Sequence, residues 1–195
     1  ELAHGWAAIA NGDQTPRELG HMTPNPVVHM GWMSLLMFAL VGIAWGQMPT
    51  DPRRYRHLRL GCLLVSAAGP AMNVLLAFLA LTAQGAWMWA TATGRITAAE
   101  QTVINVKTFL WLGGFLNLVL AVFNLLPVPP LDGSRILAAA VPAIGRFYAR
   151  PEVMAYGMIV VLVLFFGVAQ APVERTLAVA AVRYSGWVAQ TLDRS

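Results

Sequence analysis

The sequence predicts an all-α membrane protein, a bundle of transmembrane helices with room for a short strand pair at the membrane face. Of its 195 residues 57% are hydrophobic and 11% are charged, whereas a soluble domain carries about a quarter charged residues. Two apolar runs, 60–81 and 106–126, are each long enough to cross a bilayer as a helix. Residues 1–172 are therefore expected to form one membrane domain, followed by a tail at 173–195.

The charge pattern predicts the orientation of these spans. The net charge of +4 comes from twelve arginines and one lysine, and in a membrane protein such an excess indicates topology before it indicates nucleic-acid binding. The loops 49–59 and 127–150 lie on the same side of the two spans and are basic, whereas loop 82–105 is nearly neutral. The positive-inside rule makes the basic side cytoplasmic. The single cysteine, Cys62, excludes a disulfide within the chain.

The first segments alternate between apolar and polar. Residues 1–10 are typical of the end of a helix, and the Asn-Gly-Asp of 11–13 ends it. Residues 15–29 are polar, contain three prolines and cannot span a membrane. Within them 22–27 is expected to be extended, because residues before proline avoid the α region, and a short strand is predicted there. Residues 30–48 are apolar but short, which predicts a membrane-inserted helix or a re-entrant segment.

The middle of the chain contains the clearest spans. Residues 60–81 are predicted to be a transmembrane helix interrupted at Gly69-Pro70. Residues 82–105 are predicted to be a loop, with Trp87 at the membrane–water interface. The second span, 106–126, follows.

The C-terminal part contains a last apolar segment, 154–168, and a tail. Four residues of the tail recur at helical spacing, which predicts an interfacial amphipathic helix over 173–192. They are Leu177, Ala181, Tyr184 and Val188.

A proline-rich stretch directly after the second span places a carboxylate where the helix must stop. Three prolines follow Leu126, and proline lacks the N–H that a helix needs. Irregular backbone at membrane depth occurs where it is buried in protein or lines a wet cavity, and an ionisable residue there indicates a functional site. Asp132 is that residue. The alternative is a structural role, in which Asp132 caps a short helix over 133–141 and pairs with Arg135.

The start of the chain carries a second candidate site. Glu1 and His4 are three residues apart, which puts both on nearly one face of a helix. They match the last four residues of His-Glu-x-x-His, in which two histidines bind zinc and the glutamate is the general base. The first histidine would lie directly before Glu1, so a fragment cut inside this motif is the simplest interpretation. A pair that occurs by chance on a helix is the alternative.

Four separated motifs occur along the chain. They are Glu-Leu-Ala-His-Gly-Trp at 1–6; Gly12-Asp13 with Thr23-x-Asn25-Pro26-x-x-His29; Ala68-Gly69-Pro70-x-x-Asn73; and Asn124-x-x-Pro127-x-Pro129-Pro130-Leu131-Asp132-Gly133. Together they resemble the site-2 protease family of intramembrane zinc metalloproteases, in its compact bacterial form. The likeness covers about residues 1 to 140.

This resemblance implies a role for each candidate residue. His4 and Asp132 would bind one zinc ion (Zn2+), with the histidine before Glu1 as the third ligand, and Glu1 would be the catalytic base. Asn73 and Asn124 would orient substrate backbone or a ligand carboxylate, although hydrogen bonding between helices explains both equally well. Family members often continue His-x-Asp-Pro where this chain has His29-Met30-Gly31-Trp32, and this departure leaves His29 without an assigned role.

The predicted function is therefore that of a metalloendopeptidase, with residues 1–172 as the protease-like domain. It would cut a peptide bond in or near a transmembrane segment of another membrane protein, such as an anti-sigma factor or a signal-peptide remnant. The expected location is the bacterial inner membrane, multi-pass, with the site towards the cytoplasm and no nucleic-acid partner. One alternative is an inactive relative that acts as a membrane scaffold. Another is a transporter fragment using Asp132, but it would need a second intramembrane carboxylate, and the spans 60–81 and 106–126 contain none.

Overall fold

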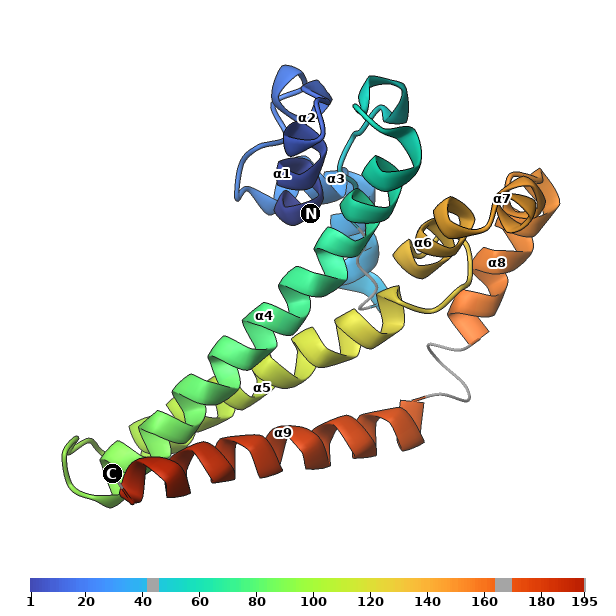
Figure 1. Cartoon of the computed structure of the whole chain (residues 1–195). Coiled ribbons are helices and arrows are strands. Elements are labelled where there is room, and N and C mark those ends of the chain that lie inside the picture. Colours follow the sequence, from blue (N-terminus) through green and yellow to red (C-terminus); the bar gives the residue numbers. More distant parts are fainter. Residues whose placement is uncertain (42–45, 164–169, 195) are drawn as a thin grey trace. The chain divides into compact units, whose positions relative to one another are not determined.

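The computed structural model describes residues 1–41, 46–163 and 170–194, and the regular structure in these ranges is entirely helical (Figure 1). The α-helices are α1 (Leu2–Ala10), α2 (Thr15–Glu18), α3 (Pro26–Val41), α4 (Leu58–Ala92), α5 (Glu100–Asn124), α6 (Asp132–Ala140), α7 (Pro142–Tyr148), α8 (Pro151–Val163) and α9 (Gln170–Asp193), with a 3-10 helix η1 (Pro52–Arg54) before α4.

The chain divides into two compact units. The first, called here the site unit, consists of Glu1–Gly69 and Leu125–Gly157. The second, called the helix unit, consists of Pro70–Asn124 and Met158–Ser195. The long helix α4 contributes its beginning to the site unit and the rest to the helix unit. The division predicted from sequence, 1–172 and 173–195, stays a prediction.

Two helices, α4 and α5, are long and apolar enough to cross a membrane. Their most apolar windows have mean hydropathies of 2.0 and 1.8, and only 22% and 11% of those windows is buried. A helix in the core of a soluble protein would be mostly buried, so these exposed apolar surfaces suit lipid. The two predicted spans are confirmed as helices of this kind, and α4 is longer than expected.

Within the helix unit, α9 runs alongside α5 and the later part of α4 (Figure 1). Small residues let the helices come close. A Cβ on Gly85 would lie 2.6 Å from the carbonyl oxygen of Ser185, and one on Gly114 would lie 2.5 Å from Leu81 Cγ. The hydroxyls of Thr82 and Tyr184 form a hydrogen bond of 2.9 Å. Small residues at the contact and a few polar links are typical of helices packed in membranes.

The predicted strand at 22–27 is wrong, and the part of the chain that the structure describes contains no strand. Two side chains capture the backbone instead: Asn25 N–H donates to Thr23 Oγ1 at 3.3 Å, and Val27 N–H donates to Asn25 Oδ1 at 3.0 Å. Asn is a favoured N-cap residue and Pro26 is a favoured first helical residue, so the segment turns and begins α3.

The predicted loop at 82–105 is also mostly wrong, because α4 continues to Ala92 and α5 begins at Glu100. The extra turns of α4, 82–92, contain four alanines, the strongest helix former. The Thr91 hydroxyl donates to the carbonyl of Trp87 within the helix at 2.9 Å. Gly69-Pro70 does not end the helix, and Pro70 lies inside α4.

The short apolar segments agree in part with the prediction. The segment predicted at 30–48 begins earlier, as α3, and Gly31 interrupts its helical geometry with φ 65° and ψ 166°. Residues 46–50 are non-helical, and 42–45 lie outside the described residues. The apolar segment predicted at 154–168 is α8 as far as Val163, and its last predicted residues, 164–168, also lie outside the described part.

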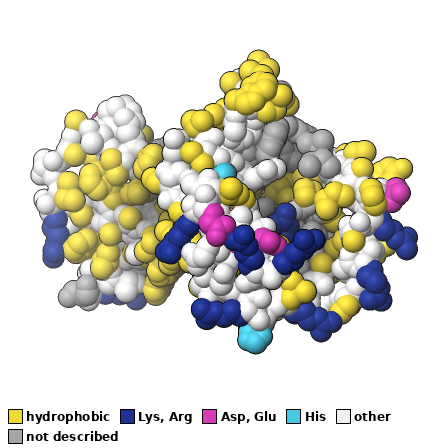
Figure 2. Space-filling model, turned by 90° about the horizontal axis from the view of Figure 1, so that it is seen from above, with side chains coloured by type: hydrophobic (Ala, Val, Ile, Leu, Met, Phe, Trp, Pro, Cys, Tyr) yellow, Lys and Arg dark blue, Asp and Glu magenta, His cyan; other side chains and the backbone are white. Residues whose placement is uncertain are grey.

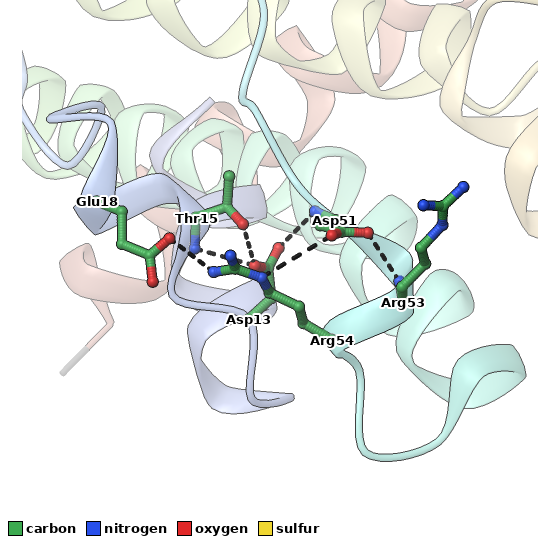
Figure 3. Close-up of polar contacts among 6 residues, drawn as sticks. All are labelled: Asp13, Thr15, Glu18, Asp51, Arg53 and Arg54. Carbon is green, nitrogen blue, oxygen red and sulfur yellow. Dashed lines mark hydrogen bonds and ion pairs between the residues drawn. The ribbon is translucent and has the colours of Figure 1, made fainter.

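A buried carboxylate joins the segment after α1 to the segment before α4 (Figure 3). Asp13 is 0% exposed. It accepts the backbone N–H of Asp51 at 2.7 Å and that of Thr15 at 2.9 Å, and also the Thr15 hydroxyl. Arg54 pairs with Glu18 at the surface at 2.6 Å. In the space-filling view, acidic side chains lie next to basic ones near the centre of the face shown (Figure 2).

Candidate functional site

His4 and Asp132 lie close together in the site unit, although they are 128 residues apart in the sequence. His4 is in the first turn of α1, and Asp132 is the first residue of α6. His4 Nε2 lies 3.4 Å from Asp132 Oδ2, and the two side chains are 15% and 14% exposed. Two donor atoms at the edge of a tetrahedral zinc centre are about 3.3 Å apart, given Zn–N and Zn–O distances of about 2.0–2.1 Å. The pair therefore has the spacing of two zinc ligands.

His4 is held from its other side by α4. Its Nδ1 lies 2.7 Å from the backbone carbonyl oxygen of Val65. Such a bond between a ring nitrogen and a backbone carbonyl is typical of metal-binding histidines, because it orients the ring.

Asp132 is the first residue of α6, and the N-cap position is occupied by Leu131 in an extended conformation. Asp132 therefore does not occupy the N-cap position that the structural alternative predicted for it. The following glycine explains how α6 comes so close to the break after α5. A Cβ on Gly133 would overlap the carbonyl oxygen of Leu125 and would lie 2.5 Å from that of Leu126.

Glu1 directly precedes α1, and its side chain lies against the non-helical segment 46–50. A Cβ on Gly46 would be 2.7 Å from Glu1 Oε1 and 2.7 Å from Glu1 Cγ. Glycine at this position therefore leaves room for the carboxylate beside the backbone. Glu1 as a whole residue is exposed.

The other candidate residues are not brought to this pair by any described contact. Asn73 in α4 and Asn124 at the end of α5 are half-buried and belong to the helix unit. Their roles stay predictions. His29 binds elsewhere in the site unit, with Nε2 2.6 Å from the carbonyl oxygen of Thr23. Its ring lies edge-on to that of His21, with centroids 6.2 Å apart.

Among the described residues no group of three or more His, Cys, Asp or Glu side chains could hold a metal ion. His4 and Asp132 supply an imidazole nitrogen and a carboxylate oxygen, which together with a second imidazole make a donor set typical of catalytic zinc. The two residues fit a zinc centre, and one further donor would complete it.

Comparison with known proteins identifies the family. The model of "Peptidase family M50" matches residues 1–168. A Bacillus subtilis protein named "Putative zinc metalloprotease YwhC" is 37% identical over 172 residues, which cover 85% of this chain and 74% of the relative. The proteins named "Putative zinc metalloprotease Rip2" are 29% identical, in Mycobacterium tuberculosis over 187 residues (86% of this chain, 66% of the relative) and in Mycolicibacterium smegmatis over 170 residues (84% and 61%).

The chain belongs to peptidase family M50. The predicted resemblance to the site-2 proteases is thereby confirmed, as is the prediction of a hydrolase acting on peptide bonds. Proteases of family M50 are membrane proteins, in agreement with the apolar helices α4 and α5. The names of the relatives imply zinc. The chain spans less than two thirds of the Mycolicibacterium smegmatis relative. No solved structure is significantly similar to this chain.

Two residues of the site unit have contacts that sequence reasoning did not assign to them. Asp13 was interpreted as part of a helix stop and of one motif, and in the structure it joins the segment after α1 to the segment before α4. Gly69 was interpreted as a helix interruption, yet it lies against His4. For Asp13 a signal existed, because Asp followed two residues later by Thr is a turn pattern. For Gly69 the signal was its place in the motif Ala68-Gly69-Pro70-x-x-Asn73, but this motif does not indicate a contact with His4.

Proposed function

We propose that this M50 protein is an intramembrane zinc endopeptidase that cuts a peptide bond in or near a transmembrane segment of another membrane protein. The observation that carries the proposal is the approach of His4 Nε2 to Asp132 Oδ2, 3.4 Å apart at low exposure. Membership of family M50 and the apolar surfaces of α4 and α5 support it.

Each residue of the pair has a defined task. His4 donates the lone pair of Nε2 to zinc, and Asp132 donates a carboxylate oxygen. The third ligand is proposed to be the histidine of the His-Glu-x-x-His motif, one helical turn before His4. When bound, zinc supplies a Lewis acid that makes water more acidic and polarises the scissile carbonyl.

Glu1 is proposed as the general base. Its carboxylate accepts a proton from the attacking water and delivers that proton to the nitrogen of the departing amine, so the same group acts first as base and then as acid. Asn73 and Asn124 are proposed to orient the substrate backbone or a ligand carboxylate through their amides. The alternative for both remains a hydrogen bond between helices, worth about 0.6 kcal/mol on average.

The substrate is proposed to be a single-span membrane protein or a signal-peptide remnant. The basic segments 49–59 and 127–150 support an orientation in which Asp132 lies towards the cytoplasm of a bacterial inner-membrane protein. Cuts are therefore expected in the cytoplasmic half of the substrate's span.

The test compares variants of the full-length protein in zinc content and in cleavage of a model single-span substrate, with the cut ends mapped by mass spectrometry. Asp132→Ala is expected to lose both zinc and cleavage, and Glu1→Gln is expected to keep zinc and lose cleavage, because an amide cannot accept the proton. The matched control is Glu152→Ala, since Glu152 is also an acidic residue in the first turn of a helix of the site unit.

The outcomes separate the proposal from its rivals. Normal zinc content in Asp132→Ala would return Asp132 to a structural role. Near wild-type cleavage by Glu1→Gln would refute the base assignment. A wild-type protein that binds zinc but cuts nothing from a broad panel of membrane substrates would favour the inactive scaffold. Cuts clustered on the periplasmic side would refute the orientation alone.

A further inference from the structure

Two groups of α4, one turn apart, face the same imidazole. The backbone carbonyl of Val65 lies 2.7 Å from His4 Nδ1. Gly69 is four residues further along, and residues at this spacing share one face of a helix. A Cβ on Gly69 would overlap His4 Nε2 and would lie 2.6 Å from Cε1 and 3.2 Å from Cδ2. The bare backbone of Gly69 is therefore in contact with the edge of the ring that carries Nε2.

The carbonyl of Val65 fixes the tautomer of His4. A carbonyl oxygen can only accept a hydrogen bond, so the proton of the neutral ring must be on Nδ1. The lone pair then belongs to Nε2, the atom that faces Asp132. With Nδ1 bonded to Val65, Nε2 is the ring nitrogen left to bind a metal.

We propose that Gly69 is a positioning residue, which together with the Val65 carbonyl fixes the position and orientation of the His4 ring as a metal ligand. This inference rests on the proposed zinc site and adds to it a residue that binds neither zinc nor substrate. Gly69 can take this role because it has no side chain, which leaves room for the His4 ring. Any Cβ at residue 69 displaces Nε2 from the position 3.4 Å from Asp132 Oδ2.

The consequence is that the smallest substitution has a large effect on metal binding. The neighbour that a methyl group would meet is a ring whose Nδ1 is bonded to the carbonyl of Val65. The ring cannot turn aside without breaking this bond or moving Nε2 away from Asp132. Changes around zinc ligands cost about 10–100-fold in metal affinity. Helix formation is not the cause, because alanine is a better helix former than glycine.

The test measures zinc affinity of the purified full-length protein by competition with a chromogenic chelator, and records the visible spectrum of the Co2+-substituted form. Gly69→Ala is expected to bind zinc about 10–100-fold more weakly and to give an altered Co2+ spectrum. Gly113→Ala is the matched control, since Gly113 also lies inside an apolar helix but a Cβ there meets nothing within 4 Å. It is expected to behave as wild type in both measurements.

A structural role of Gly69 predicts a different result. It would lower the Tm of the metal-free protein and leave the zinc affinity and Co2+ spectrum of the folded fraction unchanged, and this result would overturn the inference. If Asp132→Ala loses zinc while Gly69→Ala binds as wild type, only the inference fails. If Asp132→Ala keeps zinc, the proposed site fails and the inference with it.

A second measurement needs no variant at residue 69 and serves if Gly69→Ala does not fold. Nitrogen-15 NMR of the wild-type protein, with histidines labelled and zinc removed, reports which ring nitrogen of His4 carries the proton. His4→Gln assigns the signal. A hydrogen-bonded, slowly exchanging proton on Nδ1 supports the proposed arrangement, whether or not Nε2 is also protonated in the zinc-free protein. A bare Nδ1 overturns it.

Discussion

In the site unit, polar groups join segments that are far apart in the sequence, whereas in the helix unit α4, α5 and α9 meet mainly through small residues. The site unit has the buried Asp13 bonded to the backbone of Asp51, and His4 bonded to that of Val65. The helix unit has Gly85 against α9 and Gly114 against Leu81. Glycine serves both units, but it makes room for a functional side chain in the first and for another helix in the second.

The proposed function accounts for this difference. Helices in lipid gain little from burying apolar side chains, because lipid is equally apolar, so close contact of backbones provides much of the attraction. A metal site needs individual atoms held in place, and hydrogen bonds to backbone groups provide this direction. We therefore expect substitutions to act on the two units in different ways.

The largest effect on stability is expected for Asp13→Ala, which leaves the N–H groups of Thr15 and Asp51 without their acceptor. A hydrogen bond to a charged group is worth about 1.5–3 kcal/mol, so we expect a loss of about 3 kcal/mol in thermal unfolding in detergent, accompanied by weaker zinc binding. Glu18→Ala is the control, because Glu18 belongs to the same network (Figure 3) but is exposed. A stability of Asp13→Ala equal to that of the control would show that polar links do not hold this unit.

The same carboxylate gives a pH dependence. Burial raises the pKa of Asp13, but hydrogen bonds from the Thr15 hydroxyl and from the backbone of Asp51 and Thr15, with the nearby Arg54, lower it below the ordinary 3.8. Because the folded pKa is the lower one, this stabilisation is present above pH 3.8 and is lost as the pH falls through the folded pKa. Asp13→Ala should lack this part of the acid-induced loss, whereas Glu18→Ala should retain it.

An intermediate effect is expected for Gly85→Ala in the helix unit. Its Cβ would lie 2.6 Å from the carbonyl oxygen of Ser185 and from Val188 Cβ, and overpacking of this kind costs about 1–3 kcal/mol. The control is Gly186→Ala, since a Cβ on Gly186 meets nothing within 4 Å. Thermal unfolding in detergent measures both, and zinc affinity should be unchanged in both. Loss of zinc in Gly85→Ala would contradict the separation of the two units' roles.

The smallest effect is expected for Tyr184→Phe, which removes the hydrogen bond to Thr82 in the helix unit. A double-mutant cycle with Thr82→Ala should give a coupling energy of about 0.6 kcal/mol. A coupling above about 2 kcal/mol would mean that polar links matter as much here as in the site unit, and the contrast between the units would be lost.

Much of the fold and site could be read from local sequence. The apolar runs predicted α4 and α5, the prolines after Leu126 predicted the break before α6, and the four motifs predicted the family. These signals are local. The length of an apolar run, the missing N–H of a proline and the spacing of a motif can each be read without knowing how the rest of the chain folds. The strand predicted at 22–27 is wrong because the side-chain oxygens of Thr23 and Asn25 accept hydrogen bonds from backbone N–H groups, and these bonds turn the chain into a helix start.

Sequence by itself named Glu1, His4 and Asp132 as candidates, because ionisable residues are rare in an apolar chain and therefore conspicuous. Only the tertiary structure brought His4 within 3.4 Å of Asp132 and turned its Nδ1 to Val65. It alone distinguished Gly69, which lies against the ring, from Gly113, which meets nothing. The physical reason is that a glycine carries no chemistry of its own, so its importance depends entirely on which atoms the fold places beside it.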